Sequence, residues 1–282
     1  MLILNNRVDL IAYLKPFMVA KSSIGFVPTM GALHKGHLSL LKESINNNKV
    51  TIVSIFVNPT QFNNQEDLAK YPRTLKEDVA KIETISDSIV IYAPTVEDIY
   101  EVKTVSQHFD FDGLENQMEG KYRPGHFDGV GTVVKRLFEI VTPTNAYFGE
   151  KDFQQLQIIR KLVEKNNLQV TIVECPIFRE QNGLAMSSRN ERLTIEEREK
   201  AAIIFKTLEK AKAKFKNKST NEVANFVVNT FKKHLEFELE YFEIADEETL
   251  LKCFRKNKNK KYRAFIAVFV NNIRLIDTIS LN

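Results

Sequence analysis

The sequence is poor in cysteine and has no long apolar run, and each absence excludes a class of protein. Cys175 and Cys253 are the only cysteines among 282 residues, and no paired spacing connects them. A disulfide framework and a cysteine zinc site are therefore excluded, and a reducing compartment is favoured. No apolar window reaches 18 uninterrupted residues, so we expect no membrane-spanning helix and no membrane partner.

A leader pattern, an internal repeat and a strong charge imbalance are also missing. The stretch that begins at Met1 carries Arg7 and Asp9 within its apolar run and lacks the cleavage site of a signal peptide, so we expect a cytoplasmic protein. The formal net charge of +4 is mild and does not indicate a nucleic-acid partner. The dense basic run over residues 255–263 is typical of a solvated loop, with an anion or RNA patch as the alternative.

Short apolar runs alternate with amphipathic stretches over the first two thirds of the chain. The runs predict strands over residues 24–28, 50–57, 88–92, 145–148 and 169–173. The amphipathic stretches predict helices over residues 37–46, 74–84, 127–141 and 152–166. Buried strands that alternate with helices indicate an α/β fold with a doubly wound, Rossmann-like parallel sheet, whose ligands bind at the carboxyl ends of the strands.

The pattern changes after about residue 178. Thr194 with Glu197, and Ser219 with Glu222, have the spacing of capping boxes, and each pair predicts the start of a long helix. Two β-rich runs flank residues 271–272 and predict a hairpin. We therefore expect a nucleotide-binding domain over residues 1–177 and a smaller α+β C-terminal domain over residues 178–282.

The segment PTMGALHKGH, residues 28–37, joins the first predicted strand to a helix. Its two glycines let the backbone approach a ligand closely, and the helix start offers free N–H groups to a phosphate. His34 and His37 are spaced to share one helical face, where imidazoles can stabilise charge on a transferring phosphoryl group. Helix capping and metal ligation are the alternatives for this pair.

Neutral amides follow the next predicted strand, in the segment SIFVNPTQF. Asn58 and Gln61 lie where the strand ends, and their amides can bind a carboxylate or a hydroxyl without adding charge. Because Asn-Pro is also a common turn, this segment alone is a weak indication of a site.

Two later segments carry cations and hydroxyls. In FGEKDFQQ, Gly149 permits a tight turn, Asp152 can cap the next helix, and Lys151 can bind polyphosphate as a point charge, although Lys151 can equally be a simple loop charge. GLAMSSRN, residues 183–190, has the composition of a mobile anion-binding loop, but SSR is common. Together with the histidines and amides, these groups are what adenylyl transfer from ATP requires, because that chemistry depends on positioning and charge stabilisation.

Six segments in this order resemble the pantothenate synthetases, a family of the HIGH-motif nucleotidyltransferase group: PTMGALHKGH, SIFVNPTQF, YPRT (71–74), HFDGV (126–130), FGEKDFQQL and GLAMSSRN. The resemblance implies a homodimer that uses ATP and Mg²⁺, with the C-terminal domain as a lid. It implies that (R)-pantoate attacks the α-phosphate of ATP to give pantoyl-adenylate and pyrophosphate. β-Alanine then attacks the acyl carbon, and AMP and pantothenate are released.

The resemblance also assigns site residues. It implies that His34, His37 and Lys151 are catalytic, with His37 at the position of a proton donor. Gln61 and Gln155 match substrate-binding positions, Gln61 for pantoate and β-alanine and Gln155 for pantoate. Glu77 and Asp78 match acidic residues near the metal, with a solvated helix face as the alternative. The implied ATP contacts are Met30, Gly31, Ala32, Leu33, His34, Lys35, Gly36, His37, Gly149, Glu150, Lys151, Asp152, Phe178, Met186, Ser187, Ser188 and Arg189.

Three other functions are weighed against a ligase. A nucleotidyltransferase that leaves a stable adenylylated product would need an acceptor site for a nucleotide, whereas Gln61 and Gln155 suit a small hydroxy acid. A non-enzymatic nucleotide sensor would need neither Lys151 nor two histidines. An RNA-binding protein would need a basic stripe interleaved with aromatics, and the basic run contains only Tyr262.

Overall fold

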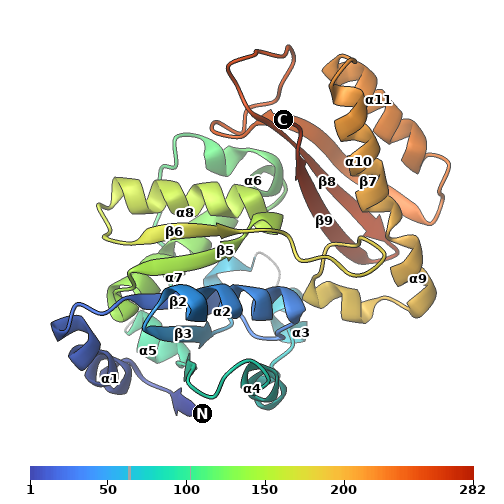
Figure 1. Cartoon of the computed structure of the whole chain (residues 1–282). Helices are drawn as coiled ribbons and strands as arrows, with labels where there is room; N and C mark the ends of the chain where they lie inside the picture. The colour runs from blue at the N-terminus through green and yellow to red at the C-terminus, as the bar shows by residue number, and fades with distance from the viewer. Residues whose placement is uncertain (63–64, 102) are drawn as a thin grey trace. The chain divides into compact units, whose positions relative to one another are not determined.

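The computed structural model describes residues 1–62, 65–101 and 103–282 (Figure 1). These residues divide into two compact units, which are described separately. The first unit contains residues Met1–Gly149 and Gln155–Cys175, and the second contains Glu150–Gln154 and Pro176–Asn282. A single division at residues 177 and 178 was predicted, whereas the chain passes between the units three times.

The first unit is built on a six-stranded parallel sheet with the order β1-β4-β3-β2-β5-β6. This order confirms the predicted doubly wound fold. Because β2 lies between β3 and β5, the chain changes direction across the sheet at β2, and ligands of such sheets bind beside that point. The strands are β1 (Leu2–Leu4), β2 (Ile24–Thr29), β3 (Val50–Ile55), β4 (Val90–Tyr92), β5 (Asn145–Gly149) and β6 (Thr171–Cys175).

The helices of this part of the chain include every one that was predicted, together with several short ones that were not. The α-helices are α1 (Arg7–Val19), α2 (Lys35–Asn47), α3 (Gln65–Lys70), α4 (Leu75–Glu83), α5 (Val96–Tyr100), α6 (Met118–Tyr122), α7 (His126–Val141) and α8 (Phe153–Lys165). Single turns of 3₁₀-helix are η1 (Pro59–Gln61) and η2 (Leu114–Asn116), and a third, η3 (Glu150–Asp152), follows β5 but belongs to the second unit.

The helices α2 and α7 cover opposite faces of the parallel sheet. Side chains alternate between faces along a strand, so neighbours such as Phe26 and Val27 on β2 point in opposite directions. Val27 belongs to the buried cluster that contains Leu41 of α2. Phe26 instead meets Phe138 of α7 edge to face, with ring centroids 6.2 Å apart. Burial on both faces explains why the strands read as continuous apolar runs.

Helix α7 approaches the turn η1 so closely that only glycine fits. A Cβ atom added to Gly129 would lie 2.5 Å from the carbonyl oxygen of Thr60 and 2.6 Å from Cα of Gln61. Asn58 stabilises the same contact, because its Nδ2 donates a hydrogen bond to the carbonyl oxygen of Gly129 at 3.1 Å. The position of η1, and with it Gln61, is therefore fixed by α7.

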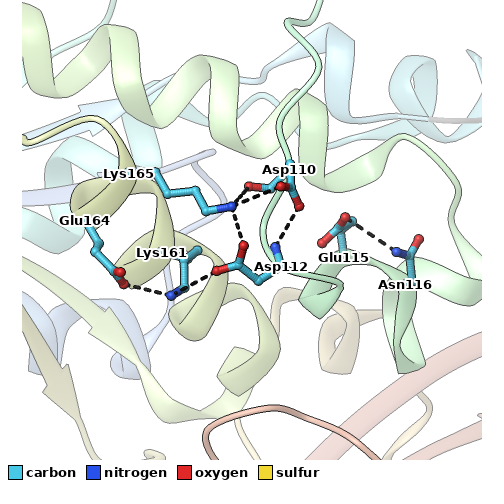
Figure 2. Close-up of polar contacts among 7 residues, drawn as sticks. All are labelled: Asp110, Asp112, Glu115, Asn116, Lys161, Glu164 and Lys165. Carbon is cyan, nitrogen blue, oxygen red and sulfur yellow. Dashed lines mark hydrogen bonds and ion pairs between the residues drawn. The ribbon is translucent and has the colours of Figure 1, made fainter.

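An ion-pair network holds an irregular segment against α8 (Figure 2). Lys165 donates to the carboxylates of Asp110 and Asp112, and Lys161 lies 3.2 Å from Asp112 and 2.8 Å from Glu164. The hydrogen bond from Lys165 is the main reason that the pKa of Asp112 lies below its usual value. These groups are exposed, so the network orients the segment more than it stabilises the fold.

The second unit contains a three-stranded antiparallel sheet covered on one face by helices, as drawn in orange and red in Figure 1. Leu208 of α10 and Val227 of α11 share a buried cluster with Ile266 and Val268 of β8. The predicted hairpin at residues 271–272 is confirmed by the pairing of β8 with β9. The elements are η4 (Ser188–Arg192), α9 (Ile195–Lys200), α10 (Ile203–Phe215), α11 (Thr220–Phe231), β7 (Phe237–Asp246), β8 (Tyr262–Val270) and β9 (Ile273–Ser280).

Both predicted capping boxes are present, but one of the predicted long helices is not. Ser219 caps α11 and Thr194 caps α9, each reciprocally with a glutamate three residues on. Helix α9 ends after six residues, and α10 begins beyond a turn at Ala201 and Ala202. Both alanines are buried, with exposures of 0% and 2%, so tertiary packing of this turn interrupts the helix.

The pentapeptide Glu150–Gln154 packs on the face of the three-stranded sheet that the helices leave uncovered. The ring of Phe153 lies 6.0 Å from that of Phe265, and the Arg263 guanidinium lies 3.9 Å above the Phe153 ring. Phe265 neighbours Ile266 on β8 and so points to the opposite face. The basic run predicted as a solvated loop is partly paired, because Lys260 contacts Asp246 at 3.1 Å and Arg263 contacts Glu247.

The sequence predicts neither a disulfide nor a membrane-spanning helix. Cys175 and Cys253 are both free and buried. None of the helices in the described ranges combines the length and the apolar character that a bilayer crossing requires.

Candidate active site

A buried carboxylate from α4 organises the loop that follows β2. Asp78 is fully buried, and its Oδ2 and Oδ1 accept the N–H groups of Ala32 and Leu33 at 2.9 and 2.7 Å. Lys81, one turn further along α4, donates to the carbonyl oxygen of Leu33 at 2.7 Å. Ala32 needs this support because its φ of 49° is unfavourable for a residue with a side chain, whereas Gly31 adopts its φ of 83° without strain. Two side chains of α4 therefore fix the backbone conformation of residues 30–33.

His34 and His37 form a reciprocal cap at the start of α2. Nδ1 of His34 accepts the N–H of Gly36 at 3.1 Å, and Nδ1 of His37 accepts the N–H of His34 at 3.3 Å. The two rings lie close together, with centroids 4.0 Å apart. Since each Nδ1 accepts a hydrogen bond, a neutral imidazole in either position carries its proton on Nε2. The capping interpretation is confirmed.

Gln61 lies in contact with the loop that follows β2. Its Nε2 lies 2.9 Å from Sδ of Met30, and its Oε1 accepts from Asn58 at 3.1 Å. His126 contacts the carbonyl oxygen of Gln61 through Nδ1 at 2.9 Å. Tyr100, whose pKa is raised by burial, donates to Oδ1 of Asn58. Gln61 and Met30, which were predicted as site residues from separate segments, are therefore in contact.

The remaining predicted residues of the first unit are less constrained. Gly149 ends β5 with open space around it, since an added Cβ would meet nothing within 4 Å. Gln155 is half-buried on α8, and Lys35 is exposed at the first position of α2. Gly149 is the last residue of its strand, and Lys35 and Gln155 lie on the helices that follow β2 and β5.

Three further predicted residues lie in η3, within the second unit. The side chain of Lys151 is 16% exposed, and its Nζ lies 3.8 Å from Oδ2 of Asp152. Glu150 lies 3.8 Å from Arg263 of β8. The lysine predicted to bind phosphate therefore lies in a turn whose neighbouring residues, Glu150 and Phe153, contact β8.

The last predicted group spans a tight hairpin and η4. The carbonyl oxygen of Phe178 accepts the N–H of Met186 at 3.0 Å, and the Phe178 side chain is 39% exposed. Ser187 caps η4, accepting the N–H of Arg189 at 3.2 Å. Ser188 is half-buried and Arg189 is exposed. This segment presents hydroxyl and guanidinium groups from a hairpin that the backbone closes.

The predicted metal ligands do not lie in a cluster of acidic residues. Within residues 1–62, 65–101 and 103–282, no group of three histidine, cysteine or acidic side chains could hold a metal ion. Glu77 is exposed, whereas Asp78 is buried beneath the N–H groups that it accepts. The alternative interpretation, a solvated helix face, therefore applies to Glu77 and does not apply to Asp78.

Comparison with known proteins identifies the family. The family model described as pantoate-beta-alanine ligase matches residues 3–280 of this chain. The chain belongs to the pantoate-beta-alanine ligase family. This membership confirms the predicted enzyme class, and it favours a ligase over the nucleotidyltransferase, sensor and RNA-binding alternatives.

The relatives of this family member match it over nearly its whole length. Pantothenate synthetases of Flavobacterium psychrophilum and Bacteroides fragilis are 69% and 47% identical to it, covering 100% and 99% of this chain and 100% and 98% of their own. A pantothenate synthetase structure from Thermus thermophilus has a TM-score of 0.90 at 37% identity, covering 100% of this chain and 99% of its own. A pantoate-beta-alanine ligase structure from Francisella tularensis, described as complexed with beta-gamma ATP and beta-alanine, has a TM-score of 0.79 at 35% identity, covering 100% and 98%.

Asp78→Asn should destabilise this ligase and distort the loop at residues 30–33. An amide nitrogen cannot accept a hydrogen bond, so a buried N–H of Ala32 or Leu33 loses its acceptor, at a cost of about 1–3 kcal/mol. Urea unfolding measures the loss. Asp87→Asn, at an exposed position shortly after α4, is the control and should change stability by no more than about 0.5 kcal/mol. Equal stability of the two variants would contradict the role given to Asp78.

Proposed function

We propose that this ligase condenses (R)-pantoate with β-alanine through a pantoyl-adenylate. The supporting observation is the contact between Gln61 and Met30, whose Nε2 and Sδ atoms are 2.9 Å apart. An acid bound by the Gln61 amide would lie beside the loop that leads into the N-terminus of α2, where backbone N–H groups favour phosphate. The Francisella relative described with ATP and beta-alanine supports the same pair of ligands.

The chemistry needs no nucleophile from the protein. A carboxylate oxygen of pantoate forms a bond to the α-phosphorus of ATP as the bond to the bridging oxygen breaks, and pyrophosphate leaves. The free amine of β-alanine then attacks the acyl carbon, its proton is lost, and AMP leaves with the bonding electrons. Neither buried cysteine takes part, so activation on ATP replaces an enzyme-bound acyl ester.

The proposed role of the chain is to bind the phosphates and stabilise their charge. His34 and His37 would donate through Nε2–H while neutral, which makes His37 an electrostatic group more than a source of protons. Lys151 would add a point charge, and the hydroxyl and guanidinium groups of residues 186–189 would add further donors. The proposed adenine contact is the backbone of Phe178.

Mg²⁺ is proposed to accompany ATP instead of occupying a cage of protein ligands. Mg²⁺ commonly keeps several waters and binds through substrate phosphates with one or two carboxylates. Asp78 is fully buried and already accepts two backbone N–H groups, which argues against direct ligation. Glu77, which is exposed, is the better candidate of the two.

Isotope exchange tests the proposed order of steps. Labelled pyrophosphate should enter ATP when pantoate and Mg²⁺ are present without β-alanine, and it should not do so with β-alanine alone. Adding β-alanine should then release AMP. Formation of ADP and inorganic phosphate would indicate an acyl-phosphate instead, and a stable adenylylated product would indicate the nucleotidyltransferase alternative.

Gln61→Ala and Gln155→Ala should each weaken pantoate binding while ATP binding changes little. Each replacement leaves a polar group of the acid without its partner, at a cost of about 1–3 kcal/mol. Calorimetric titration with pantoate and with ATP measures both affinities. Gln169→Ala, which removes an exposed glutamine far along the chain, is the control. Unchanged pantoate affinity in the first two variants would remove both glutamines from the acid site.

A homodimer in the cytoplasm is also proposed. Family membership supports the dimer, and the two free, buried thiols fit a reducing compartment. Sedimentation equilibrium should give twice the chain mass of 32.5 kDa, and a mass of one chain at micromolar concentration would contradict the dimer.

A further inference from the structure

The second unit contains a buried acid that none of the proposed steps uses. Asp277 on β9 is 4% exposed. Arg179 binds it with both terminal nitrogens, at 2.7 Å from Nη1 to Oδ2 and 3.0 Å from Nη2 to Oδ1. Burial raises the pKa of Asp277, and the Arg179 guanidinium opposes that shift. This ion pair joins two residues that are 98 positions apart in the sequence.

Arg179 also holds the turn that follows it. Its Nη1 donates to the carbonyl oxygen of Gly183 at 3.1 Å, and its guanidinium lies 3.6 Å above the ring of Phe205 on α10. Gly183 has a φ of 96°, and a Cβ there would lie 2.7 Å from the Phe205 ring. One arginine therefore fixes this turn against β9 and α10 together.

The turn leads directly into the proposed ATP-binding segment, residues 186–189. The hairpin closes through the bridge between Arg179 and Ala185. Glu180 secures the far end, because its Oε1 accepts from Asn190 at 2.7 Å and its Oε2 accepts from Arg198 at 2.7 Å. Residues 179 and 180 thus anchor the segment on both sides.

The strand that carries Asp277 also contacts the turn that bears Lys151, the second group of this unit that is proposed to bind ATP. The charge of Lys151 acts to lower the pKa of Asp277. Helix η3, which carries Lys151, contacts β9. Asp277 therefore pairs with the arginine that precedes the serine-rich segment, and it lies on the strand that contacts the turn bearing the lysine.

We propose that Asp277 and Arg179 are positioning residues for ATP, which hold residues 186–189 in their binding shape. The proposal rests on the proposed use of ATP by this segment. A buried ion pair is weak evidence for stability, because the cost of desolvation offsets much of the attraction. Its geometric precision has value when a bound group must be placed closely, since a misplacement of about 1 Å can cost about a hundredfold in rate.

A matched pair on the same strand provides the control. Arg274, three residues before Asp277 on β9, binds Glu240 of β7 at 2.9 Å, and their side chains are 17% and 18% exposed. Glu240 lies on β7, at the other edge of the three-stranded sheet from β9. Glu240→Gln therefore removes an ion pair from the same sheet by changing a residue two strands away from Asp277.

The experiment compares Asp277→Asn, Arg179→Lys and Glu240→Gln in steady-state kinetics and thermal unfolding. Asp277→Asn should raise KM for ATP at least about tenfold and leave KM for β-alanine within about twofold. Arg179→Lys, which keeps the charge but loses the paired geometry, should give a smaller rise of the same kind. Glu240→Gln should lower the melting temperature without changing KM for ATP.

Two results would overturn the proposal. One is an unchanged KM for ATP in the folded variants of the Asp277 and Arg179 pair. The other is an equal rise in Glu240→Gln. If Asp277→Asn does not fold, Arg179→Lys decides. Absence of ATP-dependent turnover in the unaltered chain would instead refute the proposed function, and it would be seen before any variant is compared.

Discussion

Lys151→Ala should slow formation of the pantoyl-adenylate by about two to three orders of magnitude while the protein stays folded. The loss of one preorganised contact to developing charge commonly raises a barrier by about 3–4 kcal/mol. Lys151 is suited to this role because η3 contacts the three-stranded sheet and the Lys151 side chain is only 16% exposed. Single-turnover release of pyrophosphate from ATP and pantoate measures the effect.

The control for Lys151 is another lysine of the second unit. Lys260 pairs with Asp246 at 3.1 Å and has no proposed contact with substrate. Lys260→Ala should therefore adenylate pantoate at the normal rate. A folded Lys151→Ala variant with a rate near that of Lys260→Ala would remove Lys151 from the mechanism.

Replacement of His34 or His37 should damage the first half-reaction far more than the second. Each imidazole is proposed to donate Nε2–H to phosphates that leave as pyrophosphate before the amine attacks. Loss of one such donor should slow adenylation by about a hundredfold. Supplying preformed pantoyl-adenylate with β-alanine isolates the second step, which should proceed nearly normally in both variants.

The capping role of His34 requires a variant that separates stability from chemistry. Alanine at an N-cap costs about 1 kcal/mol, whereas asparagine is a favoured N-cap residue. His34→Asn should therefore keep the cap that Gly36 now donates to, yet adenylate as slowly as His34→Ala. Normal adenylation by His34→Asn would mean that the imidazole serves the helix alone.

The parallel sheet was predictable because its strands are buried on both faces. Val50–Ile55 is almost entirely buried, and a largely apolar run of this length, broken only by the small polar residues Thr51 and Ser54, is typical of a strand covered by helices on both sides. Strand β1 and helix α1 were missed, because three residues make a faint pattern and Pro16 lies inside the helix. The turn at residues 201–202 was missed for another reason, since alanine is a strong helix former and only packing interrupts the helix there.

The site was predictable where its residues follow strands in sequence, and unpredictable where distant residues hold them. Spacing alone placed His34, Gln61 and Lys151 beyond strand ends. It carried no sign that Asp78 accepts the N–H groups of Ala32 and Leu33, or that Arg179 meets Asp277. Such pairs depend on the three-dimensional fold and leave no local pattern.

The packing of Glu150–Gln154 on β8 has a consequence for the order of events during synthesis. This pentapeptide is made just after β5, but Phe265 and Arg263, its packing partners, are made more than a hundred residues later. At usual rates of translation the delay is about 5–20 s. During that interval the nascent chain can complete its early strands, but the residues against which Glu150–Gln154 packs have not yet been synthesised. The lysine that is proposed to bind phosphate is therefore among the last parts of the molecule to reach its final packing.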